Sequence, residues 1–267
     1  MYFAWIRKTA AALLAASAIT LPAAAAGIEI NGTPLSGQDG WVEDGVSYVT
    51  LAALSQSAGY TLTWDGSAAV LSGRGAELTA QPDSCYVEVN GRALYLPQGV
   101  TLRQGRTALP LRLLEDALGG QLTWNAGTAT ACLDLTRAWG PQADYNSEDL
   151  YWLSRIISAE SRGEPLPGQI AVGNVVLNRV KSELCPSTVK EVIFEVFNGA
   201  VQFEPVSNGS IYQSPAASSV LAAKLCLEGA SVAGESLYFY APALSSGSWI
   251  SSSRTYYATI GSHKFYL

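Results

Sequence analysis

The sequence predicts an α+β protein of two domains: a small duplicated α+β unit, then a mainly helical domain that ends in a β-hairpin. Three observations carry this prediction. A set of short motifs occurs twice in the first half of the chain, apolar residues recur at helical spacing after Ser147, and residues alternate in character near the C-terminus, as in paired strands.

The N-terminus is typical of a secretory signal peptide. Arg7 and Lys8 precede an apolar run from Ala10 to Leu21, and small residues lead to an expected cleavage site after Ala26. The alternative is a membrane anchor, but the apolar run is shorter than the roughly 20 residues that span a bilayer. We therefore expect a secreted chain that does not associate with a membrane once the signal is removed.

The charge of the chain excludes some classes of partner. Removal of residues 1–26 takes away Arg7 and Lys8 and no acidic residue, which leaves 14 basic and 22 acidic residues and a formal net charge of −8. Nucleic acids and anionic membranes favour clustered Lys and Arg, so we expect neither as a partner. The seven Trp and thirteen Tyr of the chain leave sugar binding by ring stacking open, and the oligomeric state is not predicted.

The chain contains four cysteines, two in each half: Cys85, Cys132, Cys185 and Cys226. In an exported protein an even number favours disulfides, and we expect Cys85–Cys132 and Cys185–Cys226, with buried free thiols as the alternative. Their spacing matches no zinc pattern, and His263 is the single histidine. We therefore expect neither a metal centre nor another cofactor.

The duplication covers residues 27–135 and can be read directly from the sequence. The first copy contains Ile28-Glu-Ile-Asn-Gly32, Leu51-Ala-Ala-Leu-Ser55 and Leu62-Thr-Trp-Asp65, and the second contains Val87-Glu-Val-Asn-Gly91, Leu111-Arg-Leu-Leu-Glu115 and Leu122-Thr-Trp-Asn125. Each copy predicts strands, a short helix that ends at Gly59 or Gly119, and a hairpin at the Trp. Two copies make one small α+β domain.

This arrangement resembles the copper amine oxidase N-terminal-like (stalk) domain family. The resemblance implies a spacer or a wall-attachment module, and a purely structural domain is the alternative. It implies no copper, because residues 27–135 contain no histidine. Residues 136–146 lack apolar periodicity and are predicted to be a linker before the second domain at residues 147–267.

A helix is predicted from Ser147, with Ser147 as its N-cap and acidic residues in the first turn. Leu150, Leu153 and Ile157 follow at helical spacing, and Glu160 continues the same stripe. Burial disfavours the ionised form of a carboxyl group and raises its pKa, as a general acid at neutral pH requires. Cleavage of a glycosidic bond needs such an acid to protonate the leaving oxygen.

Several motifs after Ala159 occur in one order. They are Glu160-Ser-Arg-Gly-Glu164, Gly168-Gln169, Val175-Val-Leu-Asn-Arg179, Val201-Gln-Phe203 with Pro205-Val206, Tyr238-Phe-Tyr240 and Gly261-Ser-His-Lys-Phe265. Together they resemble the cell wall hydrolases of the SleB type, which are spore cortex-lytic enzymes. The resemblance covers about residues 150–267.

The resemblance implies a lysozyme-like α+β domain that degrades peptidoglycan glycan strands, in the spore cortex or the cell wall, as a lytic transglycosylase. It implies that Glu160 is the catalytic residue, which protonates the bridging oxygen and then accepts a proton from the muramic acid C6 hydroxyl. A muramidase is the first alternative, and it would need a second carboxylate from Glu164, Glu191, Glu195 or Glu204. A non-catalytic wall-binding or sporulation scaffold protein is the second.

Supporting roles are expected for further residues of this domain. A second helix is predicted at about 167–181, and Asn174 and Asn178 lie four apart on one face of it, so they either line the substrate cleft or are surface amides. Candidate substrate contacts from the later motifs and loops are Gln202, Phe203, Tyr238, Tyr240 and Trp249. The alternative for the two tyrosines is a packed core face, and the alternative for Trp249 is the anchor of a lid. Glu204 stands before Pro205, where the resemblance implies Ser or another small polar residue.

Glu164, Arg179 and His263 are predicted to act through other residues. Gly163 and Pro165 indicate that the helix is ending, so Glu164 is interpreted as a capping or supporting acid. Arg179 is expected in a structural ion pair. His263 is expected in a hairpin turn, in a structural role rather than in acid–base chemistry.

Overall fold

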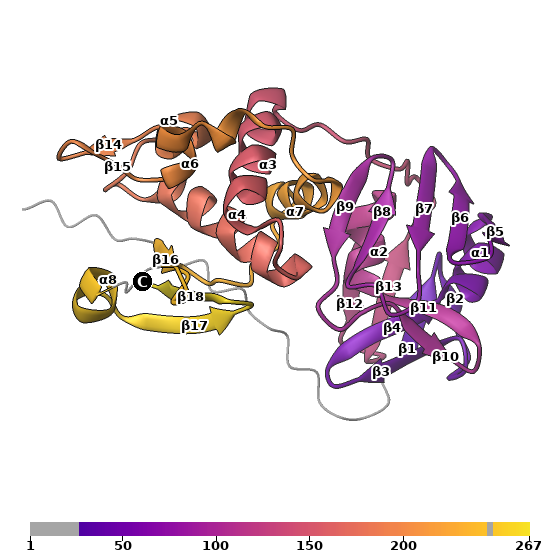
Figure 1. Cartoon of the computed structure of the whole chain (residues 1–267). Helices are drawn as coiled ribbons and strands as arrows, with labels where there is room; N and C mark the ends of the chain where they lie inside the picture. Colours follow the sequence, from indigo (N-terminus) through magenta and orange to yellow (C-terminus); the bar gives the residue numbers. More distant parts are fainter. Residues whose placement is uncertain (1–26, 245–247) are drawn as a thin grey trace, which may run out of the picture.

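The computed structural model describes residues 27–244 and 248–267, and the predicted signal peptide at 1–26 lies outside the described residues. A strand-rich part comes first, and a mainly helical part follows from Ser147 (Figure 1). The predicted α+β class is confirmed. Within the described ranges, no helix has the length and the apolar character needed to cross a membrane.

The strands of the first part form three sheets among the described residues. In spatial order, the first sheet consists of β12 (Gln121–Asn125), β13 (Thr130–Asp134), β1 (Gly27–Ile30) and β2 (Thr33–Pro34). The second consists of β10 (Thr101–Arg103), β11 (Arg106–Pro110), β4 (Val46–Thr50) and β3 (Gly40–Glu43). The third consists of β5 (Thr61–Trp64), β6 (Ala69–Gly73), β7 (Ala76–Ala80), β8 (Tyr86–Val89) and β9 (Arg92–Tyr95).

The two copies of the duplication complete each other's sheets. Strand β1 of the first copy lies parallel to β13 of the second, with Ile30 opposite Leu133. Strand β4 pairs antiparallel with β11, with Val49 opposite Leu109. Because strands of one copy pair with strands of the other, both copies contribute to a single hydrophobic core.

Glycine ends the helix of each copy, as predicted. Helix α1 (Leu51–Ala58) ends at Gly59 and α2 (Leu111–Leu118) ends at Gly119, and both glycines have φ of +72°. That left-handed conformation is costly for residues with a Cβ atom. At the other end of α1, the Thr50 hydroxyl accepts the N–H of Ala53 at 3.2 Å.

Three helices form the frame of the second part: α3 (Ser147–Ser161), α4 (Leu166–Lys181) and α7 (Ala217–Leu227). They pack closely where α4 carries Gly173. A Cβ atom there would lie 2.7 Å from Cys226 Sγ and 2.8 Å from Ile157 Cδ1. Smaller elements follow α4 in the chain: α5 (Val189–Ile193), β14 (Val196–Phe197), β15 (Ala200–Val201), α6 (Glu204–Asn208) and the 3₁₀ helix η1 (Ser210–Tyr212).

Helix α3 begins at Ser147, but its N-cap is Asn146 and not Ser147. The Asn146 side chain accepts the N–H groups of Glu148, at 2.9 Å, and Asp149, at 3.1 Å. The predicted cap was therefore wrong by one residue. Asn and Ser are both favoured caps, so their neighbouring positions could not be separated by residue type alone.

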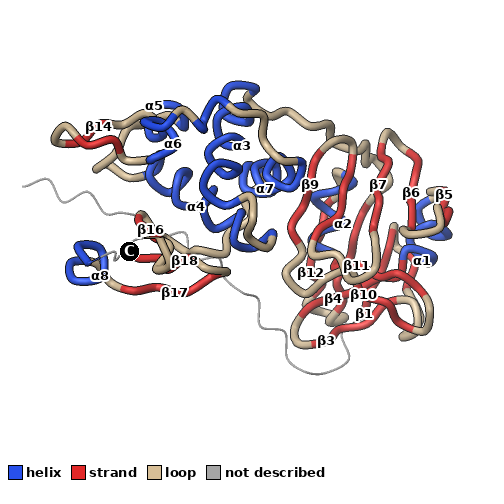
Figure 2. The backbone as a smooth tube through the Cα atoms, in the orientation of Figure 1, coloured by secondary structure: helices blue, strands red, loops and turns tan. Residues whose placement is uncertain are grey.

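A small sheet beside α4 completes the second part. Strand β18 (His263–Tyr266) lies between β16 (Tyr238–Tyr240) and β17 (Tyr256–Ile260), and α8 (Ser248–Ser253) precedes β17. Figure 2 shows this C-terminal sheet next to the helices, and both β16 and β17 contact α4. The predicted C-terminal hairpin corresponds to β17 and β18.

The expected disulfides are contradicted, because all four cysteines are free thiols. Cys226 is buried between α7 and α4, where its Sγ lies 3.4 Å from the Ile170 carbonyl oxygen. Cys132 lies on β13, with its Sγ 3.6 Å from the Glu29 carboxylate. These two thiols take part in packing and weak hydrogen bonds. Free thiols were the alternative to the predicted disulfides.

The strand-rich part contributes to the helical core through the hairpin of β8 and β9. Ala93 of β9 is buried in the same cluster as Leu153, Ile170 and Ala222, and Tyr86 and Tyr95 pack against that cluster. Residues 136–146 form neither helix nor strand. The exact domain boundaries stay a prediction, but the two parts share apolar surface.

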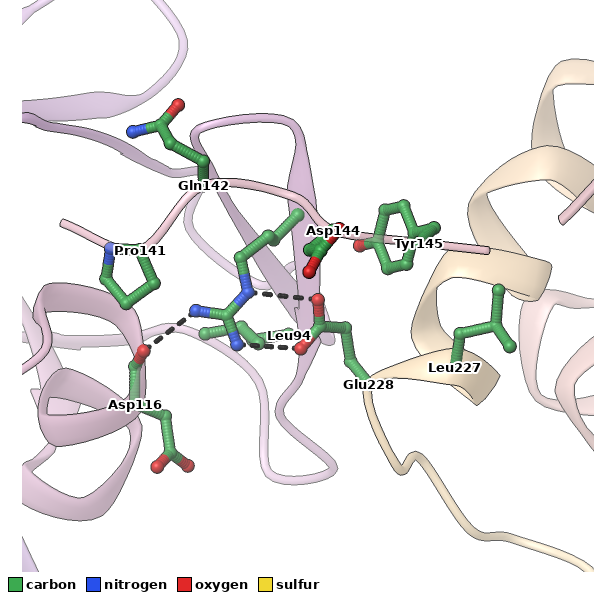
Figure 3. Close-up of a pocket in the computed structure, with 9 residues that line it drawn as sticks. Leu94, Asp116, Pro141, Gln142, Asp144, Tyr145, Leu227 and Glu228 are labelled. Carbon is green, nitrogen blue, oxygen red and sulfur yellow. Dashed lines mark hydrogen bonds and ion pairs between the residues drawn. The ribbon is translucent and has the colours of Figure 1, made fainter. Parts of the chain in front are cut away.

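A salt bridge between Arg92 and Glu228 lies beside this shared surface (Figure 3). The Arg92 guanidinium donates from Nε to Glu228 Oε1 at 2.9 Å and from Nη2 to Glu228 Oε2 at 2.7 Å, and its Nη1 donates to the Asp116 carbonyl oxygen at 2.9 Å. Glu228 directly follows α7. The bridge borders a hollow of about 560 Å³ that Asp144 and Tyr145 also line.

The Arg92–Glu228 bridge should be worth more than an exposed ion pair. Its side chains are 14% and 15% exposed, whereas those of Arg106 and Asp39 are 31% and 33% exposed. We expect Arg92→Met to lower the free energy of unfolding by roughly 2 kcal/mol, because it leaves a partly buried carboxylate unpaired. Urea titration measures this, with Arg106→Met as the control at under about 1 kcal/mol. Equal effects of the two substitutions would contradict the expectation.

Candidate active site

Glu160 lies in the last turn of α3. Leu153 and Ile157, at helical spacing before it, are fully buried, so this face of the helix is directed to the core, as the spacing predicts. The Glu160 side chain itself is half-buried. No hydrogen bond or ion pair joins its carboxyl group to any residue in the described part of the chain. A carboxyl group in this position has lost water without gaining a partner.

The pKa of Glu160 is raised from 4.5 to about 7, mainly because burial disfavours the carboxylate. The negative charge of Glu204, the first residue of α6, raises it further. The group therefore holds a proton near neutral pH and can also release it. These are the two protonation states that a general acid and general base must reach.

Glu164 lies four residues further on, in the opposite electrostatic situation. Its carboxylate accepts the N–H of Ser262 at 2.8 Å and also the Ser262 hydroxyl. These hydrogen bonds, the hydroxyl first, lower the pKa of Glu164. A side chain at Gly261 would overlap the Glu164 carboxylate. Glu164 thus attaches the β17–β18 turn to the connection between α3 and α4.

The two carboxyl groups have different tasks because their surroundings differ. Glu160 has no donor and a raised pKa, whereas Glu164 has two donors and a lowered pKa. Pairs of acids whose pKa values are separated in this way are typical of sites in which one acid carries a proton.

His263 is the first residue of β18 and pairs with Ile260, so the turn consists of Gly261 and Ser262. The prediction that His263 itself lies in the turn was wrong by one residue. Its ring is buried next to Phe239, and its Nδ1 atom lies 3.8 Å from Glu164 without a hydrogen bond. Burial lowers the pKa of His263, although the Glu164 charge opposes this.

Asn174 and Asn178 use their amides within the protein. Asn174 donates to the Ala230 carbonyl oxygen at 2.6 Å and accepts the N–H of Val232 at 2.8 Å. Asn178 donates to the carbonyl oxygens of Gly234, at 2.8 Å, and Ser236, at 3.0 Å. The prediction that this pair lines a substrate cleft is therefore corrected: the two amides hold the segment that joins α7 to β16.

Phe203 and Arg179 also belong to the interior. Phe203 is 2% exposed, so the prediction that it contacts substrate was wrong. Arg179 Nε donates to the Leu237 carbonyl oxygen at 2.8 Å, and its guanidinium lies 5.0 Å from the centre of the Phe203 ring. It has no carboxylate partner among the described residues, so the expected ion pair is absent from that part. Gln202, half-buried, donates to the Ala200 carbonyl oxygen at 3.3 Å.

The aromatic residues of β16 divide between two faces, as strand alternation predicts. Phe239 packs on Phe265 of the core, with ring centres 5.8 Å apart. On the other face, Tyr238 meets Trp249 edge-on at 5.8 Å, and the Arg254 guanidinium lies over both rings. Trp249 is 58% exposed.

Tyr240 stacks on Tyr266, at 5.9 Å between ring centres. The outward face of β16 thus presents aromatic surface that can stack on a sugar ring. A role of Tyr238, Tyr240 and Trp249 in binding substrate stays a prediction.

The sequence did not show whether Glu204 acts on Glu160. It was one of four possible second carboxylates, and the structure identifies it as the one whose charge acts on Glu160. The one sequence feature that could have drawn attention to Glu204 is its position before Pro205, where a small polar residue is expected. Within the described ranges, no group of three His, Cys, Asp or Glu side chains is arranged to hold a metal ion.

The raised pKa of Glu160 has a consequence for stability. Because the folded state holds this proton more tightly than the unfolded chain, stability is lost as the pH rises from about 4.5 to about 7. We expect Glu160→Gln to be more stable than the wild type at pH 8, by up to about 3 kcal/mol, and equal to it below pH 4.5. Denaturant titration at the two pH values measures this. The exposed Glu183→Gln is the control, and a pH-independent difference would contradict the expectation.

Two family models match the chain. Residues 163–266 match the Cell Wall Hydrolase model, and residues 29–133 match the Copper amine oxidase N-terminal domain model. Glu160 lies three residues before the first of these ranges.

Known proteins match just under half of the chain. The Spore cortex-lytic enzyme of Halalkalibacterium halodurans is 33% identical over 132 residues, which cover 49% of this chain and 38% of that protein. The Spore cortex-lytic enzyme of Bacillus cereus is 36% identical over 121 residues, which cover 45% of each. The chain spans less than half the length of these curated relatives.

A solved structure also matches, the catalytic domain of the germination-specific lytic transglycosylase SleB from Bacillus anthracis. It is 35% identical, with a TM-score of 0.43, and the match covers 48% of this chain and 100% of that one. The family models decide the assignment: the chain carries a domain of the cell wall hydrolase family, preceded by a domain of the copper amine oxidase N-terminal family.

Proposed function

We propose that the C-terminal domain cleaves the glycan backbone of peptidoglycan between muramic acid and glucosamine, as a lytic transglycosylase. The observation that carries this proposal is the unpartnered Glu160 carboxyl group, with its pKa of about 7. The match to the cell wall hydrolase family and the names of the two spore cortex-lytic relatives support the substrate class.

One carboxyl group suffices for this reaction. Protonated Glu160 donates its proton to the bridging oxygen as the bond to the muramic acid C1 breaks and the sugar gains oxocarbenium character. The resulting carboxylate then accepts the proton of the C6 hydroxyl of muramic acid, whose oxygen bonds to C1. The products are a free glucosamine hydroxyl and a 1,6-anhydro ring, and Glu160 is protonated again.

The surroundings of Glu160 favour a single acid over a pair. Glu164 is already bound to Ser262. Glu204 remains, since its charge reaches Glu160, and it supports a muramidase as the alternative function. In a muramidase, Glu204 would activate a water molecule or attack the sugar.

We also propose that the protein acts outside the cytoplasm, on spore cortex or cell wall. The names of the relatives and the predicted signal peptide support this location. The N-terminal domain is proposed to be a spacer or wall-attachment module.

Glu160→Gln should slow cleavage strongly. Gln cannot donate the proton, so we expect the clearing of purified peptidoglycan sacculi to slow by about 100-fold or more. The turbidity of the suspension measures this. Glu183→Gln, the same change at an exposed loop position, should retain the wild-type rate. Unchanged clearing by Glu160→Gln would overturn the catalytic assignment, and binding of sacculi without clearing by the wild type would favour a scaffold protein.

The pH profile should follow the proton on Glu160. We expect the turnover rate to fall as the pH rises through about 7, because the acid loses its proton. In Glu204→Gln, one cause of the raised pKa is removed, so this fall should begin at lower pH. The rate at pH 5 should remain close to that of the wild type if Glu160 acts alone.

The same Glu204→Gln variant separates the two reactions. Mass spectrometry of the released muropeptides distinguishes anhydro ends, which transglycosylation produces, from reducing ends, which hydrolysis produces. Reducing ends from the wild type, together with a loss of about 100-fold or more in Glu204→Gln at every pH, would replace the transglycosylase by the muramidase.

A further inference from the structure

A small polar hollow lies between α3 and the segment that begins with η1. Its volume is about 140 Å³. The polar residues around it are Arg155, Ser158 and Arg162 from α3, and Ser210, Gln213 and Ser214 from the opposite segment. It therefore combines two cations with hydroxyl and amide groups, and none of its lining residues is acidic.

The two arginines have no acidic partner. Neither forms an ion pair with any residue that the structure describes, whereas Arg92 and Arg106 are both paired. The whole chain contains 22 acidic and 16 basic residues, so acidic partners are not scarce. Two unpaired guanidinium groups beside one hollow leave positive charge there that a ligand can neutralise.

Arg155 is held in place by Tyr151 and keeps one N–H group without an acceptor. Its guanidinium lies 3.6 Å from the centre of the Tyr151 ring, and its Nη1 donates to the Tyr151 carbonyl oxygen at 3.4 Å. Its Nε atom is buried and makes no hydrogen bond. Stacking on an aromatic ring limits the freedom of the guanidinium, so less entropy is lost when an acceptor binds.

These donors suit an oxyanion. The planar guanidinium group donates two parallel hydrogen bonds to a carboxylate or a phosphate, and such charge-assisted bonds are stronger than neutral ones. The hollow is smaller than the roughly 300–1,000 Å³ pockets that enclose drug-sized ligands, so it fits one small anionic group and not an extended ligand.

The hollow lies on a different face of α3 from Glu160. At 3.6 residues per turn, Arg155 and Arg162 are rotated roughly 140–160° from Glu160 around the helix axis. A helix with its side chains is about 10–12 Å across. A chain that branches from the sugar beside the cleaved bond would cross that distance with about three to four extended residues.

We propose that this hollow binds a carboxylate of the peptide stem carried by muramic acid, so that the enzyme favours peptide-bearing strands. The proposal rests on the proposed function for its substrate, since the peptide stem is the part of peptidoglycan that carries carboxylates at that reach. Phosphate is the other source of the same chemistry, and the experiment separates the two.

The first test measures binding to the full mature chain by calorimetry, without catalysis. The probe is N-acetylmuramic acid carrying a tetrapeptide with one free carboxylate, at its C-terminus, compared with its methyl ester and with inorganic phosphate. We expect the carboxylate form to bind about tenfold or more tightly than the ester, and Arg162→Gln to remove that advantage. Arg162 is exposed, so its replacement should leave the fold intact.

Arg112→Gln is the matched control, because Arg112 is an exposed helical arginine far along the chain from the hollow. It should bind the probe as the wild type does. Equal binding of acid and ester, or wild-type binding by Arg162→Gln, would overturn the proposal. Binding of phosphate in place of the tetrapeptide would identify a phosphate site and would also overturn the proposal.

The second test compares cleavage of peptide-bearing strands with cleavage of strands whose stems an amidase has removed. We expect Arg162→Gln to slow the first about tenfold and to leave the second unchanged. Equal slowing on both substrates would contradict a role in reading the peptide. If the wild type cleaves neither substrate, the proposed function fails, whereas the calorimetric result still decides whether the hollow binds the carboxylate.

Discussion

The Glu160 carboxyl group is removed from water at the end of α3, and no donor in the described part of the chain compensates for this. The arrangement is costly for the fold and useful for proton transfer, because the same burial that destabilises the carboxylate moves its pKa to about 7. Glu164, four residues further along the chain, differs because its carboxylate accepts two hydrogen bonds from Ser262.

The sequence predicted features that depend on local chemistry. Helices that end at Gly59 and Gly119 follow from the freedom of glycine to adopt positive φ, and the buried face of α3 follows from helical periodicity. Features that depend on distant partners were not predicted. Asn174 is bound to a segment more than fifty residues away, and Phe203, a predicted groove residue, is buried against the Arg179 guanidinium.

The relation between the two domains could not be predicted either. The β8–β9 hairpin differs from its counterpart in the first copy at the residues that contact the helical core, with Tyr86, Ala93 and Tyr95 in place of Gly27, Pro34 and Ser36. That difference does not by itself show which surface these residues contact. Arg92 and Glu228 are 136 residues apart, and their pairing depends on how the two domains pack. The N-terminal domain thus contacts the helical domain through a shared core and a partly buried salt bridge (Figure 3).

Proton transfer by Glu160 alone requires that its carboxyl group still hold a proton near neutral pH. A direct measurement is the titration of its side-chain carboxyl carbon by NMR, in protein labelled with ¹³C at glutamate and assigned by comparison with Glu160→Gln. We expect a midpoint at about pH 7 for Glu160 and a midpoint below 4.5 for Glu164. A Glu160 midpoint near 4.5, the ordinary value for an exposed glutamate, would contradict it.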